Sequence, residues 1–376
     1  MRILLDYRPA LRERSGVGEF VHGLARALAV QRGDDELAVL TTSWRDRAAP
    51  TLADELHGVR VIDRQIPIRP LTWAWNRLEW PPVEWLAGDA DVVHSASPLL
   101  IPTSRAAQVI TVHDLHFLQR PDHGEAEMRR DFPALVHNHA QRADHLIAVS
   151  HYIASAVIRE LRVAPERVTV YSGGAPEWAA AIARERRGLP EGSILLFMGT
   201  LEPRKNVRGL LAAYARLRTL RTDAPPLILA GRVTESERSV LEQIDQPPLA
   251  GHVSVLGYVT EDERQRLYRE ARLLILPSLE EGFGLPVLEA MACGVPVVIS
   301  NRGALPEVAG NAAEPVDPND HEALAARMDR ILFDEPARDA IAKGLRRASQ
   351  YTWADAAKSA RSAYRAAIAA RAGRDR

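Results

Sequence analysis

Along the chain, short continuous apolar runs alternate with longer stretches in which apolar residues recur at helical spacing. Short continuous apolar runs are typical of strands that are buried on both faces of a parallel sheet. They fall at 2–5, 37–40, 59–62, 91–94, 109–112, 143–150, 168–171, 194–198, 227–231, 253–259, 273–276 and 295–299. Between them apolar residues recur at helical spacing, as in Phe20, Leu24 and Leu28. This order of strand, helix and strand predicts an α/β protein with parallel sheets.

The periodic pattern of apolar residues is interrupted once, around 175–192, where the chain is charged and contains prolines and glycines. A chain of 376 residues is long enough for two domains. We therefore expect a first Rossmann-like domain over 1–178, a second over 179–350, and a C-terminal helical segment over 351–376. Because both halves repeat strand–helix–strand units, we expect the two domains to face each other across a cleft.

Composition excludes several classes of protein. The net charge of −1 gives no argument for nucleic-acid binding. The single cysteine, Cys293, excludes an internal disulfide framework and fits a reducing compartment. The N-terminal apolar run is too short for a signal peptide, and no apolar stretch approaches the ~18 residues that span a bilayer. These features predict a cytoplasmic protein, with contact to a membrane surface left open.

The segment 279–294 carries two carboxylates at the predicted carboxyl end of a strand, where parallel sheets bind ligands. Glu281 lies in the turn, and Glu289 lies eight positions later on a short helix. The helix start leaves backbone N–H groups of Phe283, Gly284 and Leu285 available to a ligand. The two acids alone would also fit the acid/base pair of a hydrolase.

Two basic residues, Arg204 and Lys205, stand before or within the first turn of the next predicted helix. Cations there oppose the helix dipole unless an anion compensates, which suggests a bound phosphate or diphosphate. A solvated basic turn is the alternative. Near the N-terminus, Gly16 and Gly18 precede a helix, which fits either a phosphate-approach loop or a purely structural turn.

His113 follows a predicted strand and is well placed for chemistry or for binding hydroxyl groups. A hydrogen-bonded structural histidine, or a metal pair with His116, are the alternatives, although the H-x-x-H spacing without a further ligand is poor evidence for metal. Four tryptophans between Trp73 and Trp85 predict an irregular, partly exposed helical segment. It either packs under a loop or docks an acceptor or a membrane. An Arg-rich helix is predicted over 124–143, and if the enzyme is attached to a membrane, its part Arg129–Arg142 is expected to form the contact together with Trp73–Trp85.

Four motifs together resemble the retaining glycosyltransferases of family 4, which have the GT-B fold. They are Ser15-Gly16-Val17-Gly18, Thr111-Val112-His113-Asp114, Gly199-Thr200-Leu201-Glu202-Pro203-Arg204-Lys205-Asn206, and the stretch from Glu281 to Met291, EGFGLPVLEAM. The resemblance covers nearly the whole chain. It implies that the C-terminal helix crosses back to the first domain. One departure is Ser172-Gly173-Gly174-Ala175-Pro176, which replaces the usual hinge sequence of the family.

The resemblance also implies roles for individual residues. Arg204 and Lys205 resemble the pair that neutralises the donor diphosphate, and Glu281 resembles the acid beside the transferred sugar. Glu289 resembles the acid that binds the nucleotide ribose, and His113 the histidine near the reacting carbon. The remaining donor contacts implied are Gly16 and Gly18 over the diphosphate, Tyr258 and Val259 at the nucleobase, and the backbone of Phe283, Gly284 and Leu285.

The activity implied is retaining transfer of a hexose from a nucleotide sugar, with GDP-mannose favoured, to a glycan or polyprenyl-linked acceptor in bacterial surface polysaccharide synthesis. No cofactor and no metal are expected, and the D-x-D formed by Asp89 and Asp91 is interpreted as structural. Alternatives are a UDP-sugar-dependent glucosyl or N-acetylglucosaminyl transferase, an epimerase or phosphorylase on the same plan, and a non-catalytic nucleotide-sugar-binding subunit.

Overall fold

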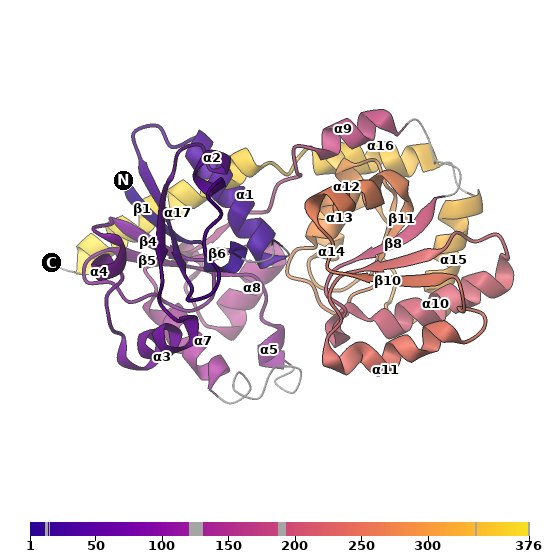
Figure 1. The fold of residues 1–376 in the computed structure, drawn as a ribbon, viewed down its shortest axis with the longest axis horizontal. Coiled ribbons are helices and arrows are strands. Elements are labelled where there is room, and N and C mark those ends of the chain that lie inside the picture. Colours follow the sequence, from indigo (N-terminus) through magenta and orange to yellow (C-terminus); the bar gives the residue numbers. More distant parts are fainter. Residues whose placement is uncertain (12–13, 15, 120–130, 187–192, 335–336, 375–376) are drawn as a thin grey trace. The chain divides into compact units, whose positions relative to one another are not determined.

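The chain forms two compact units in the computed structural model, which describes residues 1–11, 14, 16–119, 131–186, 193–334 and 337–374. Unit 1 comprises Met1–Gly174 together with Thr352–Arg376, and unit 2 comprises Ala175–Tyr351 (Figure 1). Part of the predicted border, 187–192, and part of the predicted Arg-rich helix, 124–130, lie outside the described residues.

Unit 1 is built on a seven-stranded parallel sheet in the order β3-β2-β1-β4-β5-β6-β7. Its strands are β1 (Arg2–Asp6), β2 (Glu36–Thr42), β3 (Arg60–Arg64), β4 (Val92–Ser95), β5 (Ala107–Val112), β6 (His145–Ala148) and β7 (Val168–Val170). Its helices are α1 (Val17–Val30), α2 (Leu52–Glu55), α3 (Ile68–Leu78), α4 (Glu84–Ala87), α5 (His116–Gln119), α7 (Phe132–Arg142), α8 (His151–Glu160) and α17 (Trp353–Arg374). The predicted α/β class is confirmed.

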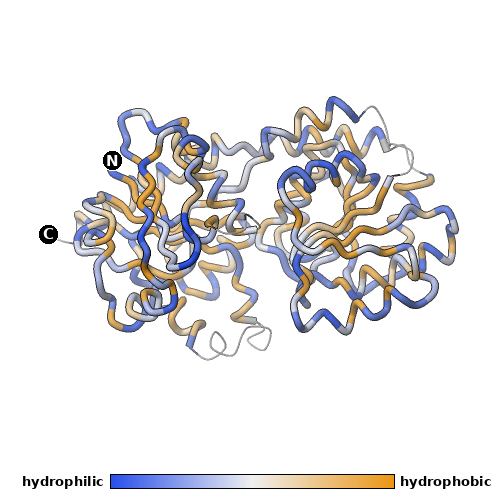
Figure 2. Tube along the Cα trace, in the orientation of Figure 1, coloured by the Kyte–Doolittle hydropathy of each residue, from blue (hydrophilic) through white to orange (hydrophobic). Residues whose placement is uncertain are grey.

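Side chains of the central strands alternate between the two faces of this sheet, and helices cover both faces (Figure 1). On one face Leu4, Leu40 and Val93 pack in a buried cluster with Leu71 and Trp75 of α3. On the other face lie α1 and α17, which contact each other, and α17 also contacts strands β4 to β7. The strands are accordingly among the most hydrophobic segments of the trace (Figure 2).

The C-terminal helix α17 is an integral part of unit 1. Tyr364 on this helix is buried, and its hydroxyl lies 2.8 Å from Nδ1 of His94 on β4. The other ring nitrogen of His94 lies 2.6 Å from the hydroxyl of Thr111 on β5. At the start of the helix, the Trp353 ring lies so close to Gly23 that a Cβ there would come within 2.3 Å of it. A larger residue at position 23 would therefore displace the helix.

Unit 2 contains a five-stranded parallel sheet in the order β10-β9-β8-β11-β12. The strands are β8 (Ile194–Met198), β9 (Leu227–Ala230), β10 (Val253–Gly257), β11 (Ala271–Leu276) and β12 (Val297–Ile299). The helices are α9 (Ala179–Glu185), α10 (Val207–Leu220), α11 (Arg238–Leu241), α12 (Glu261–Glu270), α13 (Leu285–Ala292), α14 (Leu305–Ala309), α15 (His321–Asp329) and α16 (Ala337–Ala348). Both sheets thus reverse their strand order once, between β1 and β4 and between β8 and β11.

Candidate active site in unit 2

The predicted donor residues of unit 2 gather at the point where its strand order reverses. Arg204 and Lys205 follow β8, and Glu281 follows β11, the strand that pairs directly with β8. Ligands of open α/β sheets bind at such a point, outside the carboxyl ends of the strands. The loop after β12 joins them, because the backbone N–H of Ala304 donates to the carbonyl oxygen of Glu281 at 2.8 Å.

Arg204 and Lys205 lie in a short 3₁₀ turn, Pro203–Lys205, that precedes α10. Asn206 ends this turn, and its side-chain oxygen caps α10 by accepting the N–H of Gly209 at 3.2 Å. The amide nitrogen of Asn206 donates to the carbonyl of Pro277 at 3.2 Å. The N–H of Leu279 in turn donates to the carbonyl of Arg204 at 2.7 Å. The basic turn and the acidic turn are therefore held together by one backbone hydrogen bond and by the side chain of Asn206.

Glu281 is a buried carboxylate at the centre of a charged cluster. Its Oε1 accepts a hydrogen bond from Nζ of Lys205 and another from the Ser278 hydroxyl at 3.1 Å. Its Oε2 lies 3.2 Å from the guanidinium of Arg204, which also pairs with Glu202 at 2.8 Å. The side chains of Lys205 and Glu281 are 9% and 6% exposed, so their ion pair is screened little by water.

The cluster holds Glu281 in its ionised form. Burial by itself would raise the pKa of this carboxyl, but Lys205 and Arg204 outweigh burial and keep the pKa below its ordinary value. Burial lowers the pKa of Lys205, while Glu281 opposes that shift. At neutral pH the carboxylate is therefore a fixed negative charge and cannot act as a general acid.

The charged cluster weakens the argument for a bound phosphate that was based on the dipole of α10. The sequence suggested that Arg204 and Lys205 need a compensating anion near the start of α10. In the structure Glu202 and Glu281 already supply that negative charge. The position of Arg204 and Lys205 near a helix start therefore does not by itself require a phosphate. The argument for an anion-binding site rests instead on the location of both side chains at the carboxyl edge of the sheet.

The start of α13 lies beside Glu281 and has no side-chain cap. Gly284 occupies the N-cap position with φ of 97°, and a Cβ there would lie 2.6 Å from Leu305. The ring of Phe283 packs against Tyr351 with the centroids 5.7 Å apart, so its side chain serves the core. The roles predicted for Phe283, Gly284 and Leu285 therefore concern only their backbone, which the fold keeps at this helix end.

Glu289 lies within α13 in a second, separate set of contacts. Its Oε2 accepts from the hydroxyl of Tyr268 at 2.8 Å, and its Oε1 lies 3.3 Å from the guanidinium of Arg264. The guanidinium of Arg264 lies 5.5 Å from the ring centroid of Trp178, and that ring stacks on Tyr268. Glu289 is only 4% exposed. Glu281 and Glu289 thus have different partners, unlike a shared acid/base pair.

Sequence reasoning missed Arg264, Tyr268 and Ser278. Arg264 and Tyr268 are four residues apart on α12, on the side of the helix that faces Glu289. Their spacing places them on one helical face, but nothing in the sequence identifies α13 as the element that they contact. Ser278 stands three residues before Glu281, where a local hydrogen bond was a reasonable expectation.

Tyr258 and Val259 lie in the loop between β10 and α12. The strand predicted over 253–259 ends at Gly257, because Gly257 takes a positive φ of 72° and turns the chain. Tyr258 is 40% exposed at this loop. The loop leads directly into the helix that carries Arg264 and Tyr268. That these two residues border a nucleobase stays a prediction.

The three predicted residues of the amino-terminal half belong to unit 1. His113 directly follows β5, and its Nε2 lies 3.2 Å from the carbonyl oxygen of Ala96. Burial lowers the pKa of His113 to about 4, so the ring is neutral at pH 7. If Nε2 carries the proton and donates it to Ala96, Nδ1 is left as an acceptor. Gly16 is the N-cap residue of α1 with φ of 51°, and Gly18 is buried in the first turn of that helix.

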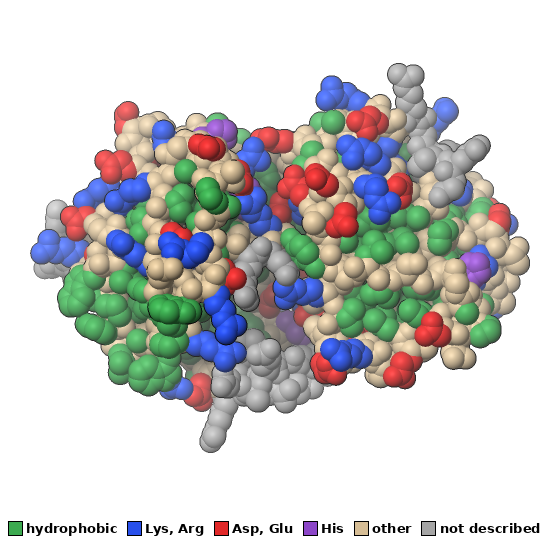
Figure 3. Space-filling view, in the orientation of Figure 1, with side chains coloured by type: hydrophobic (Ala, Val, Ile, Leu, Met, Phe, Trp, Pro, Cys, Tyr) green, Lys and Arg blue, Asp and Glu red, His purple; other side chains and the backbone are tan. Residues whose placement is uncertain are grey.

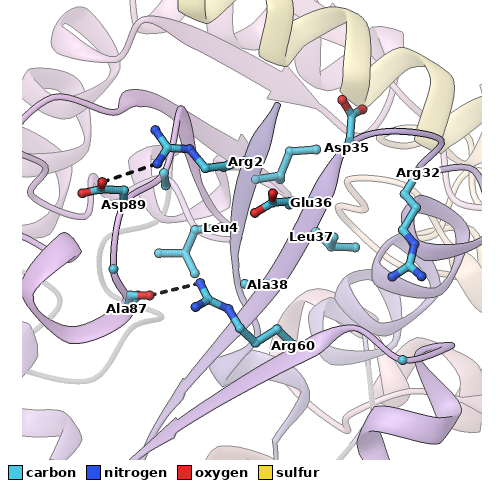
Figure 4. A pocket seen from close by; sticks show the side chains of 14 residues that line it. Arg2, Leu4, Arg32, Asp35, Glu36, Leu37, Ala38, Arg60, Ala87 and Asp89 are labelled. Carbon is cyan, nitrogen blue, oxygen red and sulfur yellow. Dashed lines mark hydrogen bonds and ion pairs between the residues drawn. The ribbon is translucent and has the colours of Figure 1, made fainter.

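A cavity of about 280 Å³ lies at the opposite, amino-terminal edge of the sheet in unit 1 (Figure 4). It is lined by first residues of three strands, Arg2, Glu36 and Arg60. Asp91 pairs with Arg2 at 2.8 Å, and Asp89 lies 3.4 Å from the same guanidinium. The two aspartates of the D-x-D sequence therefore hold the segment before β4 against the start of β1. None of the predicted site residues lines this cavity.

Family models match both halves of the chain. The model of glycosyl transferases group 1 matches residues 181–348, and the model of glycosyltransferase family 4 matches residues 14–177. The chain is 30% identical to the O-antigen chain mannosyltransferase B of Escherichia coli, over 97% of this chain and all of that protein. It is also 30% identical to the MMP alpha-(1->4)-mannosyltransferase of Mycolicibacterium hassiacum, over 75% of this chain and 72% of that protein.

Solved structures show the same fold. Sucrose-phosphate synthase from Thermosynechococcus elongatus aligns with a TM-score of 0.77 at 22% identity, covering 98% of this chain and all of that chain. Anabaena HepE, in complex with UDP and glucose, aligns with a TM-score of 0.71 at 20% identity, covering 96% and 98%. The fold is thus GT-B, the two-domain architecture of glycosyltransferases. Within that class, the chain belongs to the group 1 glycosyltransferases of family 4.

Proposed function

We propose that this chain is a retaining, metal-independent hexosyltransferase that moves mannose from GDP-mannose to a glycan or polyprenyl-linked acceptor in bacterial surface polysaccharide synthesis. The observation that carries this proposal is the cluster of Arg204, Lys205 and ionised Glu281 at the carboxyl edge of unit 2. The choice of mannose is supported by the mannosyltransferase names of the relatives.

The cluster contains what departure of a nucleoside diphosphate requires. As the bond between the sugar C1 and the phosphate oxygen breaks, negative charge grows on the leaving diphosphate. Arg204 and Lys205, with the uncapped start of α13, are positioned to stabilise that charge through charge-assisted hydrogen bonds. Because both cations are already held in place, little reorganisation energy is needed when the bond breaks.

In this proposal Glu281 acts on the sugar. Positive charge develops on C1 and the ring oxygen, and an ionised carboxylate nearby lowers the energy of that oxocarbenium-like state. An acceptor hydroxyl then forms a bond to C1 on the face that the phosphate leaves, and its proton passes to the leaving phosphate oxygen. The configuration at C1 is retained, and no covalent intermediate on Glu281 is formed.

Two further residues complete the donor site in this proposal. Glu289 binds the ribose hydroxyls, and Tyr268 and Arg264 hold its carboxylate in place for that contact. His113, neutral at pH 7, accepts or donates a hydrogen bond at a hydroxyl of the sugar. Glu281→Gln is then expected mainly to lower kcat, and Glu289→Gln mainly to raise the donor KM.

The experiment is a donor panel of GDP-mannose, UDP-glucose and UDP-N-acetylglucosamine, assayed with glycan and polyprenyl-linked acceptors in the presence and absence of EDTA. We expect GDP release from GDP-mannose that EDTA does not reduce, and a product with the α-anomeric configuration of the donor in its NMR spectrum. Release of UDP alone would refute GDP-mannose as the donor and support the alternative, a UDP-sugar-dependent transferase. An inverted anomer would refute retention, and no release from any donor would favour a non-catalytic binding subunit.

A further inference from the structure

Asn206 directly follows Lys205 and has a backbone conformation that is uncommon for a residue with a side chain. Its φ of 56° and ψ of 44° lie in the left-handed region. Among the described residues of unit 2, it is the only one other than glycine with a positive φ. Asparagine tolerates this region better than most residues, but such a conformation persists only where the surrounding contacts hold it.

The side-chain amide of Asn206 makes three hydrogen bonds that hold it in place. Its oxygen accepts the N–H of Gly209 at 3.2 Å, and its nitrogen donates to the carbonyls of Pro277 at 3.2 Å and Pro318 at 2.8 Å. Gly209 leaves room for the amide, since a Cβ there would lie 2.5 Å from the amide nitrogen. Pro277 follows β11, and Pro318 lies between β12 and α15. One side chain thus joins the segments that follow β8, β11 and β12.

Lys205 lies between two ties to the segment that carries Glu281. On one side, the residue before Lys205 accepts the N–H of Leu279 through its carbonyl at 2.7 Å. On the other side, Asn206 donates to the carbonyl of Pro277. Pro277 and Leu279 precede Glu281 by four and two residues. The spacing between the backbones of Lys205 and Glu281 is therefore fixed at two points.

Backbone spacing matters for this ion pair because the pair is buried. The face of unit 2 drawn in Figure 3 carries basic and acidic side chains close to one another. Exposed pairs such as Arg216–Glu322, whose side chains are 45% and 73% exposed, contribute little and can re-form as the side chains move. Lys205 and Glu281 instead pack among fixed neighbours. Their geometry therefore depends on where the backbone places them.

We propose that Asn206 is a positioning residue, whose two donated hydrogen bonds hold the Lys205 ammonium where negative charge grows on the leaving diphosphate. Asn206 acts through Lys205 and need not touch the donor. This role rests on the proposed function, because it assumes that Lys205 binds the diphosphate. Misplacing a group at a reaction centre by about 1 Å can lower a rate by on the order of a hundredfold.

A helix cap alone would explain only one of the three contacts of Asn206. Aspartate and serine cap helices about as well as asparagine. Of these residues, only asparagine can accept the capping N–H and donate two hydrogen bonds at the same time. Asn206→Asp keeps the shape, the capping oxygen and the tolerance of the left-handed region, and it loses both donors. Asn206→Ser keeps a capping oxygen without adding a charge, and its single hydroxyl cannot serve both carbonyls.

The test compares Asn206→Asp and Asn206→Ser with the unmodified protein in two assays. In donor turnover, both variants should lose roughly tenfold in kcat/KM, because Lys205 is displaced from the diphosphate. In an NMR titration of isotope-labelled glutamate carboxyls, Asn206→Ser should raise the pKa of Glu281 from its lowered value, because the Lys205 ammonium no longer stays at its oxygen. The titration needs no substrate.

A second capped helix provides the control. The side chain of Ser150 caps α8 of unit 1 by accepting the N–H of Ile153 at 3.1 Å. Ser150→Ala should lower the urea concentration at which half of the protein unfolds, as the loss of a cap does. It should leave kcat/KM and the pKa of Glu281 unchanged.

Two results would overturn the proposal. The first is unchanged kcat/KM in both Asn206→Asp and Asn206→Ser, which would leave Asn206 as a helix cap. The second is a pKa of Glu281 in Asn206→Ser equal to that of the unmodified protein. Failure of the proposed function gives a different result, because the unmodified protein then turns over no donor, and the pKa of Glu281 still decides whether Asn206 positions Lys205.

Discussion

Replacing Glu281 by glutamine removes one negative charge from the candidate active site and almost no volume. Lys205, whose side chain is 9% exposed, loses the carboxylate that compensates its burial. Breaking a buried ion pair by removing one partner typically costs 3–5 kcal/mol. Since the glutamine oxygen still accepts from Lys205 and Ser278, we expect the lower end, about 3 kcal/mol of unfolding free energy.

The assay is urea unfolding of Glu281→Gln beside a matched control, Glu202→Gln. Glu202 pairs with Arg204 at the same turn, but both side chains are more exposed, at 28% and 21%. The control should therefore lose less than about 1 kcal/mol. Saturating GDP should then stabilise Glu281→Gln by more than it stabilises the unmodified protein, because the diphosphate supplies the missing anion beside Lys205.

The expected kinetic effect is a lower kcat for Glu281→Gln with a donor KM that is unchanged or lower. Equal losses of stability in Glu281→Gln and Glu202→Gln would refute the argument that burial makes the Lys205–Glu281 pair the stronger one. Weaker stabilisation by GDP in Glu281→Gln than in the unmodified protein would refute the argument that the diphosphate lies beside Lys205.

Three further predictions concern the donor site and the pH dependence. Lys205→Ala should lower kcat/KM for the donor by roughly ten- to a hundredfold, the loss of one charge-assisted hydrogen bond, whereas Arg216→Ala, at an exposed ion pair on α10, should leave steady-state kinetics unchanged. Tyr268→Phe should reduce the preference for GDP over 2′-deoxy-GDP in calorimetric titrations, whereas Tyr214→Phe, where the buried hydroxyl donates to a backbone carbonyl instead, should not. In unit 1 burial lowers the pKa of His94 to about 3, and of the histidines at 22, 113, 139 and 145 to about 4, from an ordinary 6.5. The unfolded chain therefore binds more protons below pH 6.5, and unit 1 should lose stability on acidification from there towards pH 4, by up to about 1.4 kcal/mol per pH unit for each histidine; hydrogen exchange at pH 7 and 5 that opens both units equally would contradict this.

The fold was largely predictable from the sequence because strands buried on both faces produce continuous apolar runs. The run 194–198 and the strand β8, Ile194–Met198, coincide. Errors fall at strand ends, as at Gly257, where a positive φ turns the chain although the apolar residues continue. Helix starts are predictable where a cap is local: the side chain of Ser150 accepts the N–H of Ile153 at 3.1 Å at the start of α8.

The partners of the site residues were not predictable to the same degree, because they depend on packing between elements distant in the sequence. That Arg204, Lys205 and Glu281 form one cluster follows from the pairing of β8 with β11, which no local pattern encodes. The contact of Glu289 with Arg264 requires α12 to lie beside α13. The sequence shows which residues carry charge, and the tertiary fold decides which of these charges compensate one another.

The most direct test of the central claim is a calorimetric titration of the unmodified protein and of Lys205→Ala with GDP and with GMP. If Arg204 and Lys205 form the diphosphate site, GDP should bind the unmodified protein at least on the order of tenfold more tightly than GMP. Lys205→Ala should lose most of that preference while its affinity for GMP changes little. Equal affinities of the unmodified protein for GDP and GMP, or a preference for GDP that survives in Lys205→Ala, would contradict the assignment.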